Sequence, residues 1–439
     1  MSSRSVADAI VERIRGLVEE YIVAVTTRDS IMVKYANGEV TVTQAWRDYI
    51  TQVYMAKDGK VTASTFTSKD PVEAVARTVS LLEKLQPSPL YAPLPQPSGK
   101  PSSTVNPVIR DLSLAGDAAR LVEDVDVSGY GNIAGMSSLE YSNVYTVGSN
   151  GLDAGFEVTS FSGYMRVFRG ESSGQWAWVS TEYEPTLALK AIDKAVELAN
   201  LCSNLPQEKI ASGVYRVLLS PMIAGNLMER VAFAASAGSV VLGFSFLQGR
   251  RREEVIASDK LTLKEVPLEP SLPGYRSLDD EGVATRNKSV IEKGVFKGFL
   301  HNTKTARLMG EESTGNAGWI LPRIFNLEIE GGSLREEELL EALGDGVYAT
   351  NNWYTRFQNY LEGTFSTVTR DALIVVRGGR PRACARRARL TGRLPELIAS
   401  IEDLSRERWP IQWWEVDIPF IIPHILVSKL GLTMEGSIT

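Results

Sequence analysis

An α+β fold is predicted for this sequence from three observations. Apolar residues recur at helical spacing at both ends of the first 85 residues, β-type runs lie between them, and Asn37-Gly38 and Asp58-Gly59 separate adjacent runs. Both dipeptides favour tight hairpin turns, because both turn positions need a positive φ. The strands are therefore expected to pair antiparallel. At 439 residues the chain is also too long for one ordinary core, so more than one domain is expected.

The first unit, residues 1–85, has the order helix, strands, helix. The first helix is expected over 5–20, where apolar side chains stand at positions 6, 10, 14, 17 and 18. Asp70-Pro71 opens the second helix, over 71–85. Five β-type runs lie between the two helices, at 21–27, 30–36, 38–46, 48–56 and 60–66.

The composition changes over residues 86–107. This segment holds seven of the 20 prolines and shows no periodicity. Such a stretch favours extended, polyproline-like backbone, so it is expected to be a linker or a strap laid over the surface.

Residues 108–205 are expected to continue the N-terminal domain as an antiparallel meander with helices. Three long β-type runs alternate polar and apolar residues, as a sheet with one wet face does. A short helix is expected before them and a longer one after them. The runs lie at 137–147, 154–170 and 174–184, and the helices at 114–125 and 185–202.

The C-terminal domain is expected over 206–439. A strand at 214–220 runs into Ser220-Pro221, where serine suits the N-cap and proline the first helical position. The helix that follows carries Glu229 near its middle, and Gly238 is its expected end. Beyond it we expect strands at 289–301, 323–332 and 418–432, and a helix opened by a capping box, Ser333 to Glu336.

Composition narrows the chemistry and the compartment. A net charge of −6 gives no general reason to expect nucleic-acid binding. The only two cysteines, Cys202 and Cys384, suit a reducing cytosol and argue against a disulfide framework. No segment has signal-peptide or membrane-spanning character, so a soluble cytoplasmic protein is expected. Only two histidines occur, His301 and His424, so one helix cannot supply two imidazoles to a metal.

Five strings occur in an order that resembles the TldD/PmbA family, the so-called modulators of DNA gyrase. The most specific parts are D-D-E-G-x-x-T-R at 279–286 and S-T-G-N-A at 313–317. The five strings are SNGLDAGFEVTSFSGYMRV (149–167), SFLQGRRREEVIASDKLTL (245–263), LPGYRSLDDEGVATRNKSVIEKGVFKGFLHNTKTARLMG (272–310), STGNAG (313–318) and LTGRLPELIASIEDLS (390–405). The resemblance implies an α+β N-terminal domain and a C-terminal domain with antiparallel or barrel-like sheet and short helices.

The resemblance also implies a function in proteolysis. TldD-type members carry H-E-x-x-x-H on the helix that follows Ser220-Pro221, where two histidines and a distant cysteine hold a metal, usually taken as zinc. In this sequence Met228 and Phe233 stand at the two histidine positions, and only Glu229 remains. A thioether and a phenyl group cannot replace two imidazoles around zinc. No metal is therefore expected on this chain, and no catalytic residue is assigned to it beyond Glu229 as a remnant.

PmbA-type (TldE) members lack the metal motif, so this chain resembles the metal-free subunit of a cytosolic metalloprotease complex. Its expected partner is a TldD-type H-E-x-x-x-H subunit that carries zinc, or a second copy of itself. Its expected role is to enclose or hold an unfolded or extended peptide. Nucleic acid and membrane are not expected partners, and whether the chain is itself an enzyme stays open.

Two alternatives remain. The chain could be a hydrolase in its own right, using Glu229 with the acids Asp279–Glu281, since paired carboxylates can divide acid and base roles. It could also be a homodimeric binding protein or nucleic-acid-associated modulator, using seven arginines within 377–393. Those arginines stand at 377, 380, 382, 386, 387, 389 and 393.

Each candidate residue also has a plain structural explanation. Glu229 could be a solvent-facing helix carboxylate, while Met228 and Phe233 could fill the core or line an interface. The acids Asp279, Asp280 and Glu281 could be a solvated turn balanced by Arg286, or they could shape a cavity or a pairing surface. Asn316, flanked by glycine, could form a turn or offer its amide to a peptide backbone.

Overall fold

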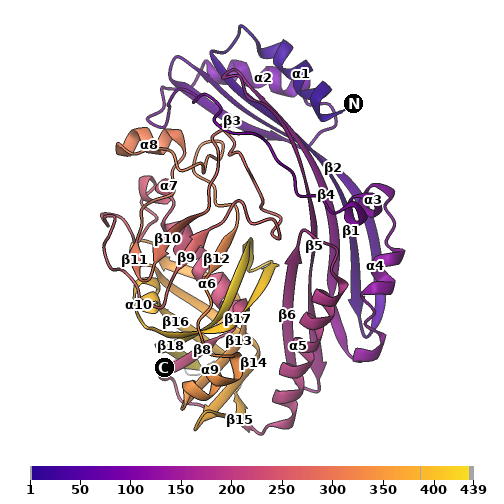
Figure 1. Ribbon diagram of the computed structural model, residues 1–439, viewed down its shortest axis with the longest axis vertical. Coiled ribbons are helices and arrows are strands. Elements are labelled where there is room, and N and C mark those ends of the chain that lie inside the picture. Colours follow the sequence, from indigo (N-terminus) through magenta and orange to yellow (C-terminus); the bar gives the residue numbers. More distant parts are fainter. Residues whose placement is uncertain (1, 386, 435–439) are drawn as a thin grey trace.

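The computed structural model describes residues 2–385 and 387–434 and has the predicted α+β class, with two sheets (Figure 1). The first sheet is wholly antiparallel, has the strand order β3-β2-β1-β4-β5-β6, and curves around the rest of the molecule. Its strands are β1 (Glu20–Ala36), β2 (Glu39–Lys57), β3 (Lys60–Phe66), β4 (Ile133–Gly148), β5 (Asp153–Arg169) and β6 (Ser172–Ser180).

The two predicted hairpin turns are confirmed, but the strands on either side of the first are longer than expected. Asn37 and Gly38 have φ of 55° and 79°, as a tight turn requires. The break expected near residue 28 is wrong, because β1 continues through it. The charged residues there face opposite charges on β2: Asp29 pairs with Arg47 across the strands, with Nε to Oδ1 at 2.6 Å.

Helices flank this first sheet. α1 (Ser3–Ile14) and α2 (Val72–Leu82) share a small apolar core at one end of it. α5 (Pro185–Asn204) packs against β5 and β6. The single helix expected over 114–125 is instead two helices, because Gly116 has a φ of 68° and ends the first of them. The pair are α3 (Pro107–Ala115) and α4 (Ala119–Asp124), followed by the short 3-10 helix η1 (Ser128–Tyr130).

The proline-rich segment forms an extended strap between the sheet and the C-terminal part of the chain. Thr104 donates its backbone N–H to Glu157 O on β5 at 3.1 Å. Ser98 donates to Gly282 O at 3.0 Å on the other side. Prolines suit this position because the strap forms almost no sheet ladder and their missing N–H groups are not needed.

The second sheet has twelve strands within the described residues, and its pairing is mixed, with parallel pairs among the antiparallel ones. β8 pairs parallel with β13, as β12 does with β18 and β7 with β15. The barrel-like expectation is confirmed, because β16 bonds both β14 and β18 and so closes the ring β18-β8-β13-β14-β16. The strands are β7 (Gln207–Glu208), β8 (Gly213–Leu219), β9 (Leu263–Glu265), β10 (Lys288–Glu292), β11 (Val295–Phe296), β12 (Leu327–Ile329), β13 (Gly346–Asn359), β14 (Thr364–Arg377), β15 (Arg380–Ala385), β16 (Ala388–Arg393), β17 (Ile401–Trp413) and β18 (Val416–Met434).

Short helices accompany this sheet, and two of their expected limits are wrong. Gly238 does not end the helix after Ser220-Pro221, which stops at Ala234, because a separate helix starts at Ala237. The expected capping box at Ser333 is absent: the N-cap is Arg335, whose backbone N–H donates to Glu338 Oε2 at 2.7 Å, and its guanidinium cannot accept the reciprocal bond. The helices are α6 (Pro221–Ala234), α7 (Ala237–Val241), α8 (Thr303–Met309), α9 (Glu336–Leu343) and α10 (Leu394–Ala399).

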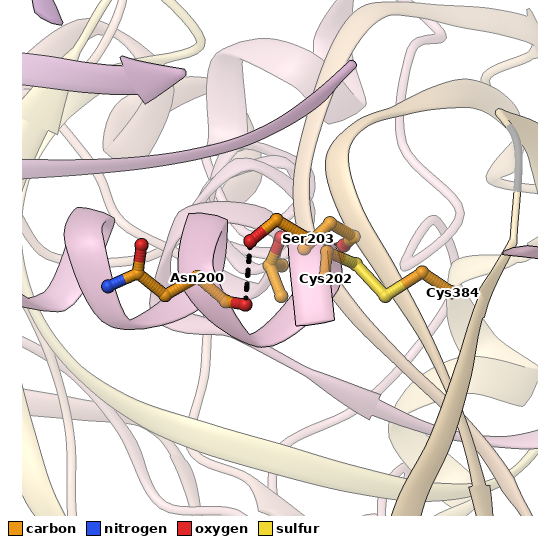
Figure 2. Close-up of a disulfide and its surroundings, with 6 residues drawn as sticks. Asn200, Cys202, Ser203 and Cys384 are labelled. Atoms are coloured by element: carbon orange, nitrogen blue, oxygen red, sulfur yellow. Dashed lines mark hydrogen bonds between the residues drawn. A yellow bond between two sulfur atoms is a disulfide. The ribbon is translucent and has the colours of Figure 1, made fainter. Parts of the chain in front are cut away.

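A disulfide joins Cys202 at the end of α5 to Cys384 on β15 (Figure 2). The sequence-based argument against disulfides is therefore wrong. The two cysteines are 182 residues apart in the chain, yet their Cα atoms lie 5.5 Å apart. Only the packing of α5 against the C-terminal sheet brings them together. Among the helices of the described ranges, none is both long and apolar enough to cross a membrane.

Candidate substrate cleft

α6 runs directly from β8 into the protein interior and packs against β13 and β18. Arg230 and Phe233 are its only residues that are not buried. Ser220 is its N-cap residue, as expected, but the Ser220 hydroxyl donates to Thr350 O and leaves the helix N–H groups uncapped. The helix is thus held by its surroundings more than by its own cap.

Glu229 is completely buried, so it is not a solvent-facing helix carboxylate. Its Oε2 accepts a hydrogen bond from the backbone N–H of Ile418 at 3.0 Å. Its Oε1 has no hydrogen-bond partner and lies 3.7 Å from the Arg230 guanidinium. Burial raises the pKa of Glu229 to about 7, and the hydrogen bond from Ile418 only partly offsets this.

Met228 and Phe233 do not form a metal site. The structure buries Met228, while Phe233 faces a surface pocket. Neither side chain offers nitrogen, oxygen or thiolate to zinc. Over residues 2–385 and 387–434, no three His, Cys, Asp or Glu side chains come together as a metal-binding group. Zinc therefore does not fit this helix.

A polar cleft of about 430 Å³ separates the concave face of the first sheet from the C-terminal part of the chain. Ile418 and its neighbour Asp417 lie in its wall, so Glu229 is directly behind that wall. The lining residues are Thr26, Arg28, Ile50 and Gln52 from β1 and β2; Glu140, Ser142, Val144, Phe156, Val158 and Ser160 from β4 and β5; and Pro273–Arg276, Arg323–Phe325, Gln412 and Asp417–Pro419.

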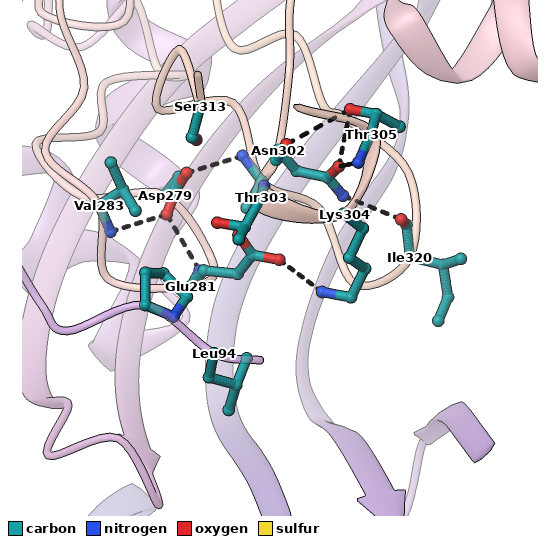
Figure 3. A network of polar contacts seen from close by, with 12 residues as sticks. Leu94, Asp279, Glu281, Val283, Asn302, Thr303, Lys304, Thr305, Ser313 and Ile320 are labelled. Carbon is teal, nitrogen blue, oxygen red and sulfur yellow. Dashed lines mark hydrogen bonds and ion pairs between the residues drawn. The ribbon is translucent and has the colours of Figure 1, made fainter. Parts of the chain in front are cut away.

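The acids of the string 279–286 are not a solvated turn, because Asp279 and Glu281 are only 4% and 1% exposed. Asp279 Oδ1 accepts the backbone N–H groups of Glu281 and Val283, and its Oδ2 accepts that of Ala317 at 2.8 Å (Figure 3). Burial, followed by the charge of Glu281, raises the pKa of Asp279 to about 7. Asp279 therefore joins the two specific family strings to each other.

Glu281 makes a buried ion pair with Lys304 and also accepts the backbone N–H of Thr303 at the start of α8 (Figure 3). The Lys304 ammonium lies 4.5 Å from the ring centre of Tyr54 on β2, which ties this cluster to the first sheet. Arg286 is exposed and makes no ion pair with these acids within the described residues, so it does not balance them. Asp280 lines a small inner cavity beside the cleft.

Asn316 is completely buried and does not offer its amide to the cleft. Its Nδ2 donates to the backbone O of Arg323 at 2.9 Å, and its Oδ1 accepts the Thr314 hydroxyl at 2.8 Å. In return, Arg323 donates its backbone N–H to Asn316 O at 2.6 Å. Asn316 thus fixes the segment that carries Arg323 into the cleft.

Arg276 and Arg323 are the cleft residues that the sequence analysis missed. Arg276 lies inside one of the family strings, three residues before Asp279, but nothing in the local pattern marks it as different from any surface arginine. Its position becomes visible only once β5 is placed opposite, with the ring centre of Phe156 at 3.9 Å from its guanidinium carbon.

A second, apolar pocket of about 260 Å³ lies on the other side of α6. We call it the α6 aromatic pocket; it is lined by Arg230, Phe233, Ala234, Ser239, Phe244, Phe246, Phe357, Tyr360, Gly363 and Leu394. Phe244 and Tyr360 are 54% and 51% exposed, and their ring centres are 5.3 Å apart. Large aromatic side chains exposed side by side are typical of a surface that another protein covers.

The arginines of 377–393 do not act as one basic surface. Arg377 pairs with Glu208, Arg389 bonds the Ser366 hydroxyl at 2.8 Å, and Arg393 lies near two glutamates. Arg380, Arg382 and Arg387 are exposed, and Arg386 lies outside the described residues.

The sequence matches a family model described as the PmbA/TldA metallopeptidase C-terminal domain over residues 212–434, just over half of the chain. A metalloprotease from Archaeoglobus fulgidus is 34% identical over 163 residues, which cover 36% of this chain and 38% of the relative. Metalloprotease PmbA of Escherichia coli O157:H7 is 31% identical over 150 residues, covering 34% and 32%. Each match thus spans less than two-fifths of the relative's length.

Solved structures are similar over nearly the whole chain. TldE from Thermococcus kodakarensis has a TM-score of 0.83 at 20% identity, covering 98% of this chain and 100% of TldE. A proposed modulator of a DNA gyrase from Thermotoga maritima has a TM-score of 0.80 at 23% identity, covering 98% and 100%. At these identities the similarity establishes the fold.

Proposed function

Because this chain belongs to the PmbA/TldD metallopeptidase family, we propose that it is the non-hydrolysing subunit of a protease assembly of that family. In this role it holds an extended peptide in the cleft, while a TldD-type partner supplies the zinc site. The observation that carries the proposal is the donor set of α6, where a buried thioether and a phenyl ring stand at the positions that the resemblance assigns to the two histidines of TldD-type members.

The lining of the cleft supports peptide holding. Its walls mix hydroxyl, amide and charged groups, among them Thr26, Gln52, Ser142 and Ser160. Such groups exchange hydrogen bonds with a peptide backbone whatever its side chains are. A cleft of about 430 Å³ accommodates a few residues of an extended chain.

The α6 aromatic pocket is the surface we propose for pairing with the TldD-type partner or with a second copy. It contains Phe233, which lies four residues after Glu229 on the same helix, and it exposes Phe244 and Tyr360. Pairing here would bring a partner's residues to the helix that lacks a metal site of its own.

The alternative of hydrolysis by Glu229 together with Asp279–Glu281 has less support. The carboxylate of Glu229 is bonded to Ile418, that of Asp279 to three backbone N–H groups, and that of Glu281 to Lys304. These contacts use the carboxylates to hold the chain in place.

Proteolysis of an unfolded probe tests the proposal. Reduced and alkylated, fluorescently labelled casein is incubated with this chain alone, with a TldD-type subunit alone, and with both. We expect no cleavage by this chain alone, and cleavage by the pair that 1,10-phenanthroline abolishes. Chelator-sensitive cleavage by this chain alone would refute the proposal. Retained cleavage by a pair carrying Glu229→Gln would argue against the hydrolase alternative, because a general base cannot be replaced by an amide.

A further inference from the structure

Two arginines point to the chemical class of peptide that the cleft takes. Arg276 and Arg323 both line the cleft, and neither has a carboxylate within 4.0 Å among residues 2–385 and 387–434. By contrast, Arg28, the third arginine of the cleft, lies 3.9 Å from Glu140. Arg276 is partly withdrawn from water, whereas Arg323 is exposed at the rim of the cleft lining. A guanidinium group withdrawn from water is normally paired, so the missing partner of Arg276 calls for an explanation.

The two specific family strings fix the segments that carry these arginines. Thr285 donates its hydroxyl to the backbone O of Arg276. Asn316 exchanges two hydrogen bonds with the backbone of Arg323. Because Asp279 joins the two strings, both arginines are held by one buried framework.

The two segments are also in direct contact. Gly274 donates its backbone N–H to Asn326 Oδ1 at 3.0 Å, and a Cβ at Gly274 would lie 2.2 Å from Phe325 O. Only glycine therefore permits this approach. The backbones are rigidly placed, while the arginine head groups extend beyond them into the cleft.

The surroundings of Arg276 suit a planar anion. Its guanidinium carbon lies 3.9 Å from the ring centre of Phe156, so the flat ring occupies one face and leaves the N–H edge for hydrogen bonding. Burial, and next the charge of Arg323, lower the pKa of Arg276 to about 10, and the charge of Asp280 offsets this only in part, so the charged form of Arg276 is incompletely compensated. A bound anion would supply that compensation.

We propose that Arg276 and Arg323 form a carboxylate-binding subsite in the cleft, so that the peptides held there are selected for a carboxylate group. The proposal rests on the peptide-holding function proposed above and names its substrate class. A carboxylate matches the two parallel N–H donors of a guanidinium in a bidentate pair. It can come from an acidic side chain within the peptide or from the peptide's C-terminus.

Fluorescence anisotropy with four coumarin-labelled hexapeptides separates these sources. All have a blocked N-terminus: polyalanine with a C-terminal amide, the same peptide with one central glutamate, the same with glutamine, and polyalanine with a free C-terminal carboxylate. The full chain is compared with Arg276→Gln, Arg323→Gln and Arg276→Lys. Arg77→Gln, an exposed arginine on α2 outside the cleft, is the matched control.

We expect a carboxylate peptide to bind roughly ten- to a hundredfold more tightly than its neutral counterpart, since hydrogen bonds to charged groups contribute on that scale. Arg276→Gln and Arg323→Gln should remove the preference for carboxylate peptides. Arg276→Lys should retain part of this preference, and Arg77→Gln should leave it unchanged. A gain for the glutamate peptide assigns the subsite to side chains, and a gain for the free C-terminus assigns it to chain ends.

The failures are distinguishable. Equal binding of all four peptides, unaffected by the arginine variants, would overturn the carboxylate subsite while leaving peptide holding intact. No binding of any peptide would overturn both. Thermal unfolding of each variant shows whether a loss of binding comes from a loss of fold. If a variant is unfolded, the test is the affinity of the unaltered chain for the carboxylate peptides compared with the neutral ones.

Discussion

The backbone N–H of Ile418 donates a hydrogen bond to Glu229 Oε2 at 3.0 Å and so joins the middle of α6 to the start of β18. Ile418 also lines the cleft, and the Glu229 carboxylate therefore supports the cleft wall from behind. Glu229, the remnant of the metal motif by resemblance, thus makes a structural hydrogen bond with Ile418 in this chain.

Glu229→Gln is expected to remove a pH dependence of stability. Burial raises the pKa of Glu229 from 4.5 to about 7. The folded protein thus favours the neutral carboxyl, and the stability from this group is complete below pH 4.5 and is lost as the pH rises towards 7. The loss amounts to about 3 kcal/mol.

Thermal unfolding at pH 5 and pH 8 measures this effect. The unaltered protein should lose more stability between the two pH values than Glu229→Gln does. Asp279, whose pKa is raised in the same direction, is present in both proteins and cancels in the comparison. An equal loss in the two proteins would contradict the prediction.

Asp279→Ala is expected to destabilise the protein by more than about 2 kcal/mol, because three buried N–H groups lose their acceptor. Asp280→Ala is the matched control, since Asp280 Oδ2 has no hydrogen-bond partner among the described residues. Chemical denaturation measures both. Similar effects of the two substitutions would show that Asp279 does not hold the loops together.

Lys304→Met is expected to cost about 3–5 kcal/mol, because it leaves the buried Glu281 carboxylate without its cation. The double variant Lys304→Met/Glu281→Gln should recover part of this loss, since it removes the unpaired charge as well. Denaturation of the single and double variants checks the sign. A double variant less stable than Lys304→Met would contradict the prediction.

Removal of the Cys202–Cys384 disulfide is expected to lower the free energy of unfolding by about 2–5 kcal/mol. The reason is that this disulfide closes a long loop in the unfolded chain and so restricts it. Dithiothreitol should lower the melting temperature of the unaltered protein and should not affect the Cys202→Ala/Cys384→Ala variant, which has no cysteine left. A thiol assay on the denatured, unreduced protein should find no free thiol. Two free thiols would show that the bond does not form.

Phe244→Glu is expected to prevent pairing without unfolding the chain, because it places a charge in the α6 aromatic pocket at a side chain that is 54% exposed. Val255→Glu, at a residue that is 76% exposed and outside that pocket, should leave pairing unchanged. Light scattering during size-exclusion chromatography gives the masses, with a TldD-type subunit and without it. Loss of pairing in both variants, or in neither, would place the pairing surface elsewhere.

Local features of the fold could be predicted because their signals lie within a few residues. The Asn37-Gly38 turn and the start of α6 at Ser220-Pro221 are two examples. The break expected near residue 28 was wrong because polar residues inside a long strand resemble a turn until their cross-strand partner, such as Arg47 for Asp29, is known.

The candidate site could be predicted only in part. The sequence indicated that the strings 279–286 and 313–317 are important. It did not show that they are buried, or that their side chains hold the backbone of Arg276 and Arg323 by hydrogen bonds. A polar side chain in a loop has the same local pattern whether it faces water or a buried N–H group.

By itself, the sequence determined that Met228 and Phe233 offer zinc no nitrogen, oxygen or thiolate, because the chemistry of a side chain at a given helix position does not depend on the rest of the fold. Only the tertiary structure decided where Glu229 points, that Cys202 meets Cys384, and that the Arg276 guanidinium faces the ring of Phe156 in the cleft. Each of these relationships joins residues more than a hundred positions apart. Such contacts follow from the packing of whole strands and helices, which no local pattern specifies.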